Sequence, residues 1–260
     1  MKLPLYQVDA FSKELYKGNP AAVVLCRSEL PEKTMQAIAA ENNLAETAFV
    51  EAADAIYHIR WFTPTVEVDL CGHATLAAAH VLFNHRDLPG DTVTFSSRSG
   101  LLHVRQEEET LYLDFPADSI TEVEAPQLLL DGLGVEPLEV YRGRDDFLVI
   151  LDNEEEILSL RPDLAAIAQV PSRGVIVSAP GREVDFVSRF FGPQSGIPED
   201  PVTGSAHTTL TPYWAKRLGK EQLTARQLSP RGGELTCKDL DLRVEIGGNA
   251  VTYLVGEINV

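Results

Sequence analysis

An acid, a thiol, a glycine and an imidazole occur together in the five residues Asp69-Leu70-Cys71-Gly72-His73. The run from Ala74 to Phe83 that follows is rich in strong helix formers and apolar on nearly every face, which predicts a buried helix. The first backbone N–H groups of such a helix have no partner within it, and they form an anion site with the positive end of the dipole. The stretch therefore predicts a buried helix whose N-terminus presents acid/base side chains to a ligand.

A second stretch has the same composition in the same order. Residues 199–210, Glu-Asp-Pro-Val-Thr-Gly-Ser-Ala-His-Thr-Thr-Leu, again run from an acid through glycine into a helix-like segment. The surroundings also repeat, because Arg60–Pro64 precedes the first stretch and Arg189–Pro193 precedes the second. This order indicates an internal duplication, with two related lobes that each contribute one helix start to a cleft. Pro212 has no counterpart in the first copy, so we expect the second helix to be kinked or shorter.

The glycines at the two helix starts have two interpretations. Gly72, Gly204 and Ser205 could supply backbone N–H groups to a substrate carboxylate or a developing enolate. The glycines could equally serve only to allow a tight turn.

Composition limits the class of partner. The chain has 260 residues, a net charge of −17 and three cysteines, Cys26, Cys71 and Cys237. A strongly acidic chain argues against nucleic acid as a partner, but a local field can still bind a small anionic metabolite. The N-terminal residues resemble no signal peptide, and no later run is long enough to span a membrane. Three widely spaced cysteines fit a reducing cytoplasm without disulfides.

The periodicity of the chain predicts an α+β fold. Short strands surround each central helix, and the acidic segment from Pro116 to Pro126 has no periodicity and so marks the crossing between lobes. We expect an N-terminal lobe over residues 1–117 and a C-terminal lobe over residues 118–260, whose last strand could pack back on the first lobe. No glycine-rich dinucleotide or P-loop motif is present, so we expect no cofactor. The predicted elements are strands 5–11, 21–25, 44–50, 56–62, 92–97, 101–106, 111–115, 146–151, 175–179, 184–191, 234–247 and 251–260, with helices from Pro31 to Asn43 and near 162–169.

Four motifs, in this order along the chain, resemble the PhzF-like phenazine biosynthesis family. They are Gly18-Asn19-Pro20, residues 43–47 (Asn-Leu-Ala-Glu-Thr), residues 71–75 (Cys-Gly-His-Ala-Thr) and residues 199–207. The resemblance implies the fold of diaminopimelate epimerase: two pseudo-symmetric lobes, each a strongly curved, mostly antiparallel sheet around a central helix. It also implies a cofactor-independent isomerase, often a homodimer.

The resemblance also assigns roles to individual residues. Glu46, otherwise a solvated turn glutamate, falls where similar proteins keep their general acid/base, and a carboxylate can carry a proton between two carbons. His73 would hydrogen-bond the substrate or a proton in transit, and we expect it to be neutral because a helix N-terminus disfavours positive charge. Asp200 would hold a polar or cationic group of the substrate, although it could instead cap the second helix. Asn19 and Ala74 join Gly72, Gly204 and Ser205 as expected substrate-binding residues.

Cys71 leaves a different mechanism open. A thiol at a helix N-terminus can have a lowered pKa and act as a base, as the two facing cysteines of diaminopimelate epimerase do. The second motif contains no thiol, which favours Cys71 as a small buried apolar residue. A metal site from Cys71, His73, His80 and His207 fits no standard zinc spacing, so we expect no metal. The sequence thus predicts a cytoplasmic isomerase of a small carboxylate-bearing metabolite. A cysteine-dependent amino-acid racemase or epimerase and a non-catalytic metabolite-binding module are the alternatives.

Overall fold

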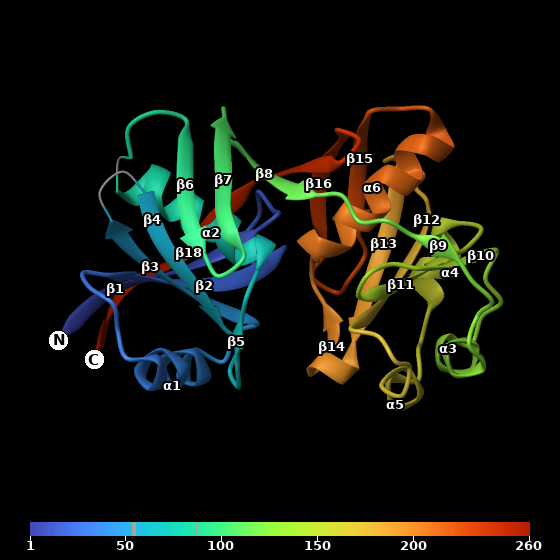
Figure 1. Cartoon of the computed structure of the whole chain (residues 1–260), viewed down its shortest axis with the longest axis horizontal. Coiled ribbons are helices and arrows are strands. Elements are labelled where there is room, and N and C mark those ends of the chain that lie inside the picture. The colour runs from blue at the N-terminus through green and yellow to red at the C-terminus, as the bar shows by residue number, and fades with distance from the viewer. Residues whose placement is uncertain (54–55, 87) are drawn as a thin grey trace. The chain divides into compact units, whose positions relative to one another are not determined.

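A computed structural model describes residues 1–53, 56–86 and 88–260 of the chain. It contains two compact units, the first formed by Met1–Asp114 with Gly247–Val260 and the second by Phe115–Ile246 (Figure 1). The chain passes from the first unit to the second within strand β8 and returns within β17. Among the described residues, every helix is too short or too polar to cross a lipid bilayer.

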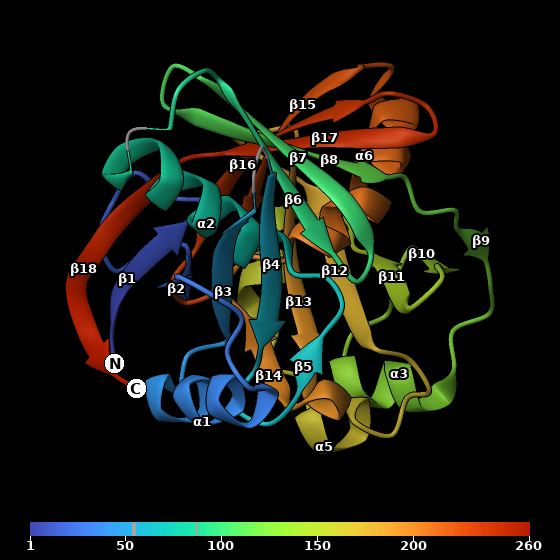
Figure 2. The ribbon, with the colours of Figure 1, turned by 60° about the vertical axis from the view of Figure 1, so that its left-hand side comes forward.

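The first unit is a mixed sheet with two helices. Its strands, in chain order, are β1 (Lys2–Ala10), β2 (Asn19–Cys26), β3 (Glu46–Ala53), β4 (Ile56–Phe62), β5 (Glu67–Val68), β6 (Thr92–Ser97), β7 (Gly100–Glu107), β8 (Thr110–Pro116) and β18 (Ala250–Asn259). Its helices are α1 (Glu32–Asn42) and α2 (Gly72–His85). The last strand, β18, pairs antiparallel with β1, so the two chain termini lie side by side (Figure 2).

The second unit has the same mixture of elements. Its strands are β9 (Thr121–Glu122), β10 (Glu139–Arg142), β11 (Asp146–Ile150), β12 (Gly174–Pro180), β13 (Phe186–Gly192), β14 (Ile197–Asp200), β15 (Gln222–Gln227), β16 (Gly233–Asp239) and β17 (Arg243–Gly248). Its helices are α3 (Gln127–Leu133), α4 (Glu154–Ser159), α5 (Leu164–Ile167), a 3₁₀ turn η1 (Pro193–Ser195) and α6 (Gly204–Leu218).

The strand pairings show the duplication directly. In the first unit β1–β2 is antiparallel, β2–β3 parallel, β3–β4 antiparallel, β4–β6 parallel and β6–β7 antiparallel. In the second unit β10–β11, β11–β12, β12–β13, β13–β15 and β15–β16 repeat that series of directions in the same order. The predicted α+β repeat is therefore present in the topology of the chain, and helices α2 and α6 occupy equivalent places in it.

An arginine–glutamate pair also repeats, at the arginines that marked the duplication in the sequence. Arg60 on β4 donates two hydrogen bonds to Glu67 on β5, at 2.7 and 2.8 Å. Arg189 on β13 donates two to Glu199 on β14, at 2.7 and 2.9 Å. Two parallel N–H···O bonds fix both the distance and the orientation of the partners. Each pair therefore ties the segment that leads into a central helix to the neighbouring strand.

Helix α2 is buried over most of its length, as its composition predicts. Nine of its residues have less than a tenth of their surface exposed, from His73 through Ala79 together with Val81 and Leu82. The helix packs on β1, β2, β3 and β18. Small side chains such as Ala77 and Ala78 let the strands approach the helix closely, which fixes the position of its first turn.

Helix α6 continues through Pro212 for 15 residues, so it is not shorter than α2; the other expectation, a kink at Pro212, stays a prediction. A proline removes one N–H and leaves the carbonyl four residues earlier without its helical partner. That carbonyl belongs to Thr208, and it accepts a hydrogen bond of 3.1 Å from the backbone N–H of Asp118. The Asp118 carboxylate also accepts a bond from the hydroxyl of Thr209. The segment after β8 therefore satisfies the group that Pro212 leaves open.

Other predicted elements needed correction in detail. The single strand expected over 234–247 is two strands, β16 and β17, with a turn at 240–242, since Asp241 adopts a left-handed backbone conformation. The helix expected near 162–169 is one short turn, α5. Strands β5, β9, β10, β14 and β15 and helices α3 and α4 were not predicted, because each has at most seven residues, which is too short for a clear period.

The buried His207 of α6 gives a prediction about stability. Its Nδ1 lies 2.8 Å from the carbonyl oxygen of Thr203 and its ring packs near Phe186, and burial lowers its pKa to about 4 despite the bond to Thr203. Only the unfolded chain binds a proton at this residue between pH 6.5 and 4. The contribution of neutral, buried His207 to the free energy of unfolding is therefore fully present above pH 6.5. It is lost as the pH falls toward 4, which lowers the free energy of unfolding by about 3 kcal/mol.

Urea unfolding of the second unit tests this expectation. The only tryptophans are Trp61 and Trp214, so a Trp61→Phe background leaves Trp214 of α6 as the reporter. His207→Asn keeps a donor for Thr203 and removes the titration, so its unfolding free energy should fall less steeply over this pH range. Equal slopes for the two proteins would contradict the assignment.

Candidate active site

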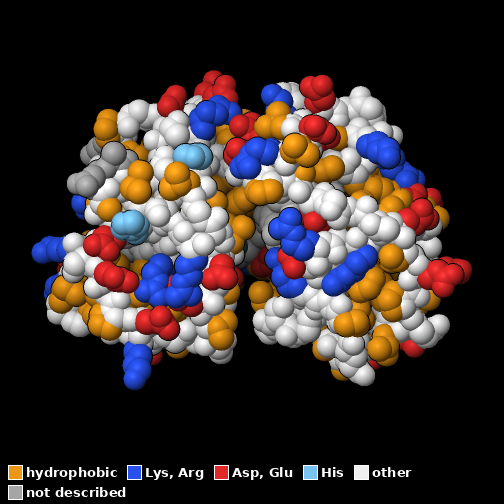
Figure 3. All heavy atoms as spheres, viewed as in Figure 1, with side chains coloured by type: hydrophobic (Ala, Val, Ile, Leu, Met, Phe, Trp, Pro, Cys, Tyr) orange, Lys and Arg blue, Asp and Glu red, His pale blue; other side chains and the backbone are white. Residues whose placement is uncertain are grey.

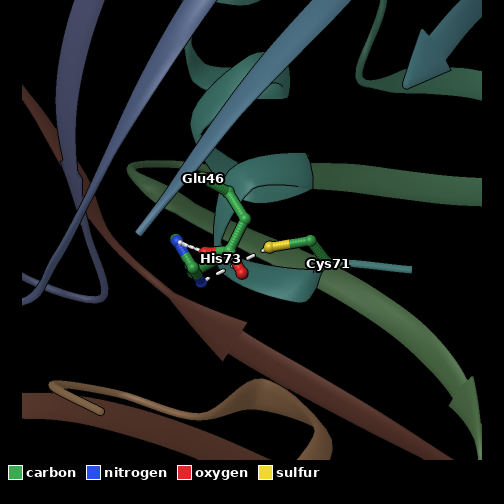
Figure 4. Close-up of side chains that lie close together, drawn as sticks. All are labelled: Glu46, Cys71 and His73. Carbon is green, nitrogen blue, oxygen red and sulfur yellow. Dashed lines mark hydrogen bonds and ion pairs between the residues drawn. The ribbon is translucent and has the colours of Figure 1, made fainter. Parts of the chain in front are cut away.

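Glu46, Cys71 and His73 lie together in the first unit, close to the start of α2 (Figure 4). Oε2 of Glu46 lies 3.2 Å from Nε2 of His73, and the sulfur of Cys71 lies 3.5 Å from Nδ1 of the same ring. The side chains of Glu46 and His73 are only 11% and 7% exposed. A carboxylate, an imidazole and a thiol are thus held in contact within the protein interior.

Local structure explains why Glu46 reaches this place. Helix α1 is followed by its C-cap residue Asn43, which adopts a left-handed conformation, and β3 begins three residues later at Glu46. Asn42 donates a hydrogen bond to the hydroxyl of Thr47, which fixes the connection. Parallel pairing of β3 with β2 sets Glu46 beside Ala21, and α2 packs on both strands.

Asn19 contacts the histidine directly. Its side-chain amide lies 3.2 Å from Nδ1 of His73, so the residue expected to bind substrate is a neighbour of the candidate acid/base pair. The turn before it requires Gly18, which has a φ of +64°. A Cβ at that position would lie 2.1 Å from the carbonyl oxygen of Ala10. The glycine therefore allows the chain to bring Asn19 against the ring.

The contact between Glu46 and His73 is close but not aligned as a hydrogen bond. Oε2 of Glu46 and Nε2 of His73 are both fully buried, and neither forms a hydrogen bond with any described residue. Buried polar atoms normally have such a partner, and those that lack one are often found at functional sites. The pair can thus exchange a proton with a third group without first breaking a strong bond.

The environment of His73 favours its charged form. Burial lowers the pKa of His73, but Cys71 and Glu46 raise it by more, so that it lies well above the ordinary value of 6.5. The expectation of a neutral histidine is therefore wrong. The adjacent carboxylate outweighs the effect of the helix N-terminus, because an opposite charge at 3.2 Å acts at closer range than the dipole.

Cys71 has the opposite character. It is the N-cap residue of α2 and only 7% exposed, and its pKa is raised by burial and then by the charge of Glu46. A low thiol pKa, which a helix N-terminus can produce, is therefore not found here, in line with the favoured interpretation of Cys71 as a small buried residue. A protonated thiol is a poor base, so the surroundings of Cys71 do not favour a cysteine-based racemase.

Asp200 belongs to the second unit and lies at the end of β14. It is 7% exposed, and its carboxylate accepts a hydrogen bond from the hydroxyl of Thr203. The capping position of α6 is Thr203 itself, so the alternative expectation that Asp200 caps this helix is wrong. Asp200 is held in the loop before the helix start.

The expected backbone donors occupy equivalent places in the two units. Gly72 and Gly204 are the first residues of α2 and α6, Ser205 is the second residue of α6, and Ala74 is the third of α2. The N-cap residues, Cys71 for α2 and Thr203 for α6, form no side-chain capping hydrogen bond. The N–H groups of the two helix starts retain the arrangement that binds anions at helix N-termini.

The four residues considered for a metal site do not form one cluster. His80 lies further along α2, where its Nε2 is 2.9 Å from the hydroxyl of Thr252, and His207 is in α6 of the second unit. In the described part of the chain, three possible metal ligands lie within 4.8 Å of one another at one place, and they come from Glu46, Cys71 and His73.

Gln227 was missed by the sequence interpretation. It is fully buried on β15, its oxygen accepts from the backbone N–H of Thr203, and its amide donates to the carbonyl oxygen of Asp200. Gln227 follows Leu223 and Ala225 at every second position, so the alternation of the strand indicated a buried amide. A buried amide needs several hydrogen-bond partners, which would have pointed to a structural role. Gln227 fixes the loop that carries Asp200.

Comparisons with known proteins agree with this description. A family model described as phenazine biosynthesis-like protein matches residues 8–256. An uncharacterized isomerase of Pseudomonas aeruginosa is 54% identical over 99% of both chains, and an uncharacterized isomerase of Halalkalibacterium halodurans is 44% identical over 99% of both. The crystal structure of a PhzF-family phenazine biosynthesis protein of Enterococcus faecalis covers 100% of both chains at 49% identity, with a TM-score of 0.97.

The last similarity confirms the fold that the resemblance implied. Family model, relatives and structure agree over nearly the whole length of the chain. The chain therefore belongs to the PhzF-like phenazine biosynthesis family, and it is an enzyme of the isomerase class.

Proposed function

We propose that the protein moves a proton between two carbon atoms of a small carboxylate-bearing metabolite, with Glu46 as the general acid/base and no cofactor. The observation that carries the proposal is the buried contact of Glu46 with His73 at 3.2 Å, in which neither facing atom forms a hydrogen bond. A carboxylate in this state can accept a proton, and a charged imidazole beside it can compensate the charge that the reaction creates.

The proton balance requires one group that acts twice. The Glu46 carboxylate takes a proton from carbon, which leaves the electron pair delocalised toward the substrate carboxylate as an enolate. The protonated Glu46 then returns the proton to the far carbon of a conjugated C=C bond of the substrate, and that double bond shifts by one position as the new C–H bond forms, so neither oxidant nor reductant is consumed. His73, charged and 3.2 Å from Glu46, lies where it can compensate the negative charge that develops during the reaction.

The remaining predicted residues bind the substrate in this proposal. The N–H groups of Gly72 and Ala74 would stabilise the enolate oxygen, because fixed donors in a buried site act strongly on developing negative charge. Gly204 and Ser205 would provide the corresponding donors of the second unit. Asp200 would hold a polar or cationic group, with Thr203 and Gln227 fixing its loop. Asn19 would orient the His73 ring, from its place 3.2 Å away.

The substrate class rests on the helix starts and on the family resemblance. The net charge of −17 disfavours a large polyanion such as nucleic acid and an anionic membrane surface. A small anionic metabolite can still bind, because the helix starts are local sites for negative charge. The cytoplasmic location and the homodimer both stay predictions.

Glu46→Gln tests the acid/base role. The substitution keeps the shape of the side chain and removes its capacity to carry a proton, so proton exchange should slow by about 10²- to 10⁴-fold. The measurement is ¹H NMR of small carboxylic acids incubated with the enzyme in D₂O, which follows the loss of substrate C–H signals.

Glu41→Gln provides the matched control, because Glu41 is an exposed residue of α1. It should exchange at the rate of the unmodified protein. Exchange by Glu46→Gln at the original rate would show that Glu46 is not the proton carrier.

Cys71→Ala separates this mechanism from the racemase alternative. A thiol kept protonated by burial and by Glu46 contributes packing rather than chemistry, so the variant should retain its exchange rate within about threefold. The same NMR assay, with circular dichroism as a check on folding, measures this. Loss of exchange comparable to that of Glu46→Gln, in a folded protein, would favour cysteine chemistry.

The assay also distinguishes an enzyme from a binding module. A module that retained the fold without catalysis would bind an acidic metabolite tightly and leave its C–H signals unchanged. Titration calorimetry with the same acids measures whether they bind, and the NMR assay measures whether they react.

A further inference from the structure

The first unit contains a cavity on the face of the sheet opposite Glu46. Its volume is about 380 Å³, in the range of small-molecule sites. Phe49 and Glu51 of β3 line it. They lie three and five positions beyond Glu46 on the same strand, and side chains an odd number of positions apart point to opposite faces of a sheet. The cavity is therefore separate from the candidate active site.

The floor of this cavity is apolar. Leu30, Met35 and Phe49 are at least nine-tenths buried and belong to the core between α1 and the sheet, and Ile59 and Cys26 complete the lining. Phe49 presents an aromatic ring, and it packs edge-on against Phe62 at a centroid distance of 5.5 Å. An apolar or aromatic body of a ligand could bury against these side chains without leaving a polar group unsatisfied.

The rim carries two acids, Glu29 and Glu51, and two arginines. Its two arginines, Arg60 and Arg98, are already paired. Arg60 contacts Glu67, Glu32 and Glu29, and Arg98 contacts Glu67 at 2.7 Å. Figure 3 shows basic side chains with acidic ones around them in the region above α1. The guanidinium groups therefore have little capacity left for an anionic ligand.

Glu51 differs from the other acids of the rim. It is half-buried, and no hydrogen bond or ion pair joins its carboxylate to another residue in the ranges that the structure describes. Its cross-strand neighbour is His58, and its charge acts on the thiol of Cys26, whose pKa is raised to about 11 by burial and then by Glu51. A partly desolvated carboxylate beside an apolar floor attracts a cation more strongly than an exposed one does.

We propose that this cavity binds a small organic cation, an ammonium group carried on an aromatic or alkyl body. The ammonium group would pair with Glu51, and the body would pack on Met35 and Phe49. The site is independent of the isomerase chemistry, because it lies on the other face of the sheet.

Calorimetry with three matched probes tests the charge preference. The probes are 2-phenylethylamine, 2-phenylethanol and 3-phenylpropionate, which share one apolar body and differ in charge. At about pH 7.5, where the amine is protonated, the ammonium probe should bind at least about tenfold more tightly than the alcohol, and the carboxylate more weakly than either.

Substitutions then locate the charge. Glu51→Gln should weaken the ammonium probe by about tenfold and leave the alcohol unchanged. Since Glu51 forms no ion pair with another described residue, the variant should keep its melting temperature. Glu136→Gln, an exposed glutamate of the second unit, removes the same charge elsewhere and should change neither affinity.

Cys26 reports where the probe binds. It is half-buried in this cavity, whereas Cys71 and Cys237 are buried. 2-Phenylethylamine should therefore slow the alkylation of Cys26 by N-ethylmaleimide, followed by peptide mass spectrometry. Tighter binding of the carboxylate, equal binding of all three probes, no ammonium binding at about 10 mM, or unprotected Cys26 would each overturn the proposal.

Discussion

A carboxylate buried in contact with a histidine is the interaction on which the first unit depends. Removing Glu46 from water is costly unless a positive charge lies beside it, and His73 supplies that charge at 3.2 Å. The neighbouring structure serves this contact. The end of α1 positions Glu46, the alanine-rich body of α2 fixes His73, and Gly18 lets Asn19 reach the ring. The two facing atoms nevertheless remain without a hydrogen bond, which leaves them available to a substrate.

The duplicated fold uses one framework for two different tasks. Both units repeat the same strand directions and the same arginine–glutamate pair before the central helix. The acid/base residues, however, occur once. At the first position of the equivalent strand, Glu46 of β3 is replaced by Gly174 of β12, and at the second position of the helix His73 is replaced by Ser205. The second unit keeps the helix start and has Asp200, consistent with a role in binding.

Sequence patterns predicted the parts of the structure that depend on strong local signals. The buried helix follows from the apolar run after Gly72, and the end of α1 lies within one residue of the predicted end at Asn43. Features decided by distant residues could not be predicted in this way. The charge of His73 depends on Cys71 and also on Glu46, the second of which is far from it in sequence. The carbonyl that Pro212 leaves open on Thr208 is satisfied by the distant Asp118. The role of Gln227 depends likewise on a loop on another element.

The protonation state of His73 is the most direct test of this account. Side-chain ¹⁵N chemical shifts of labelled protein, assigned with a His73→Gln variant, report whether one or both ring nitrogens carry a proton as the pH changes. The account predicts that both nitrogens are protonated at neutral pH, that the ring loses a proton only well above pH 6.5, and that Glu46→Gln lowers that transition. A His73 ring that is neutral at pH 7, or that titrates identically without the Glu46 carboxylate, would contradict it.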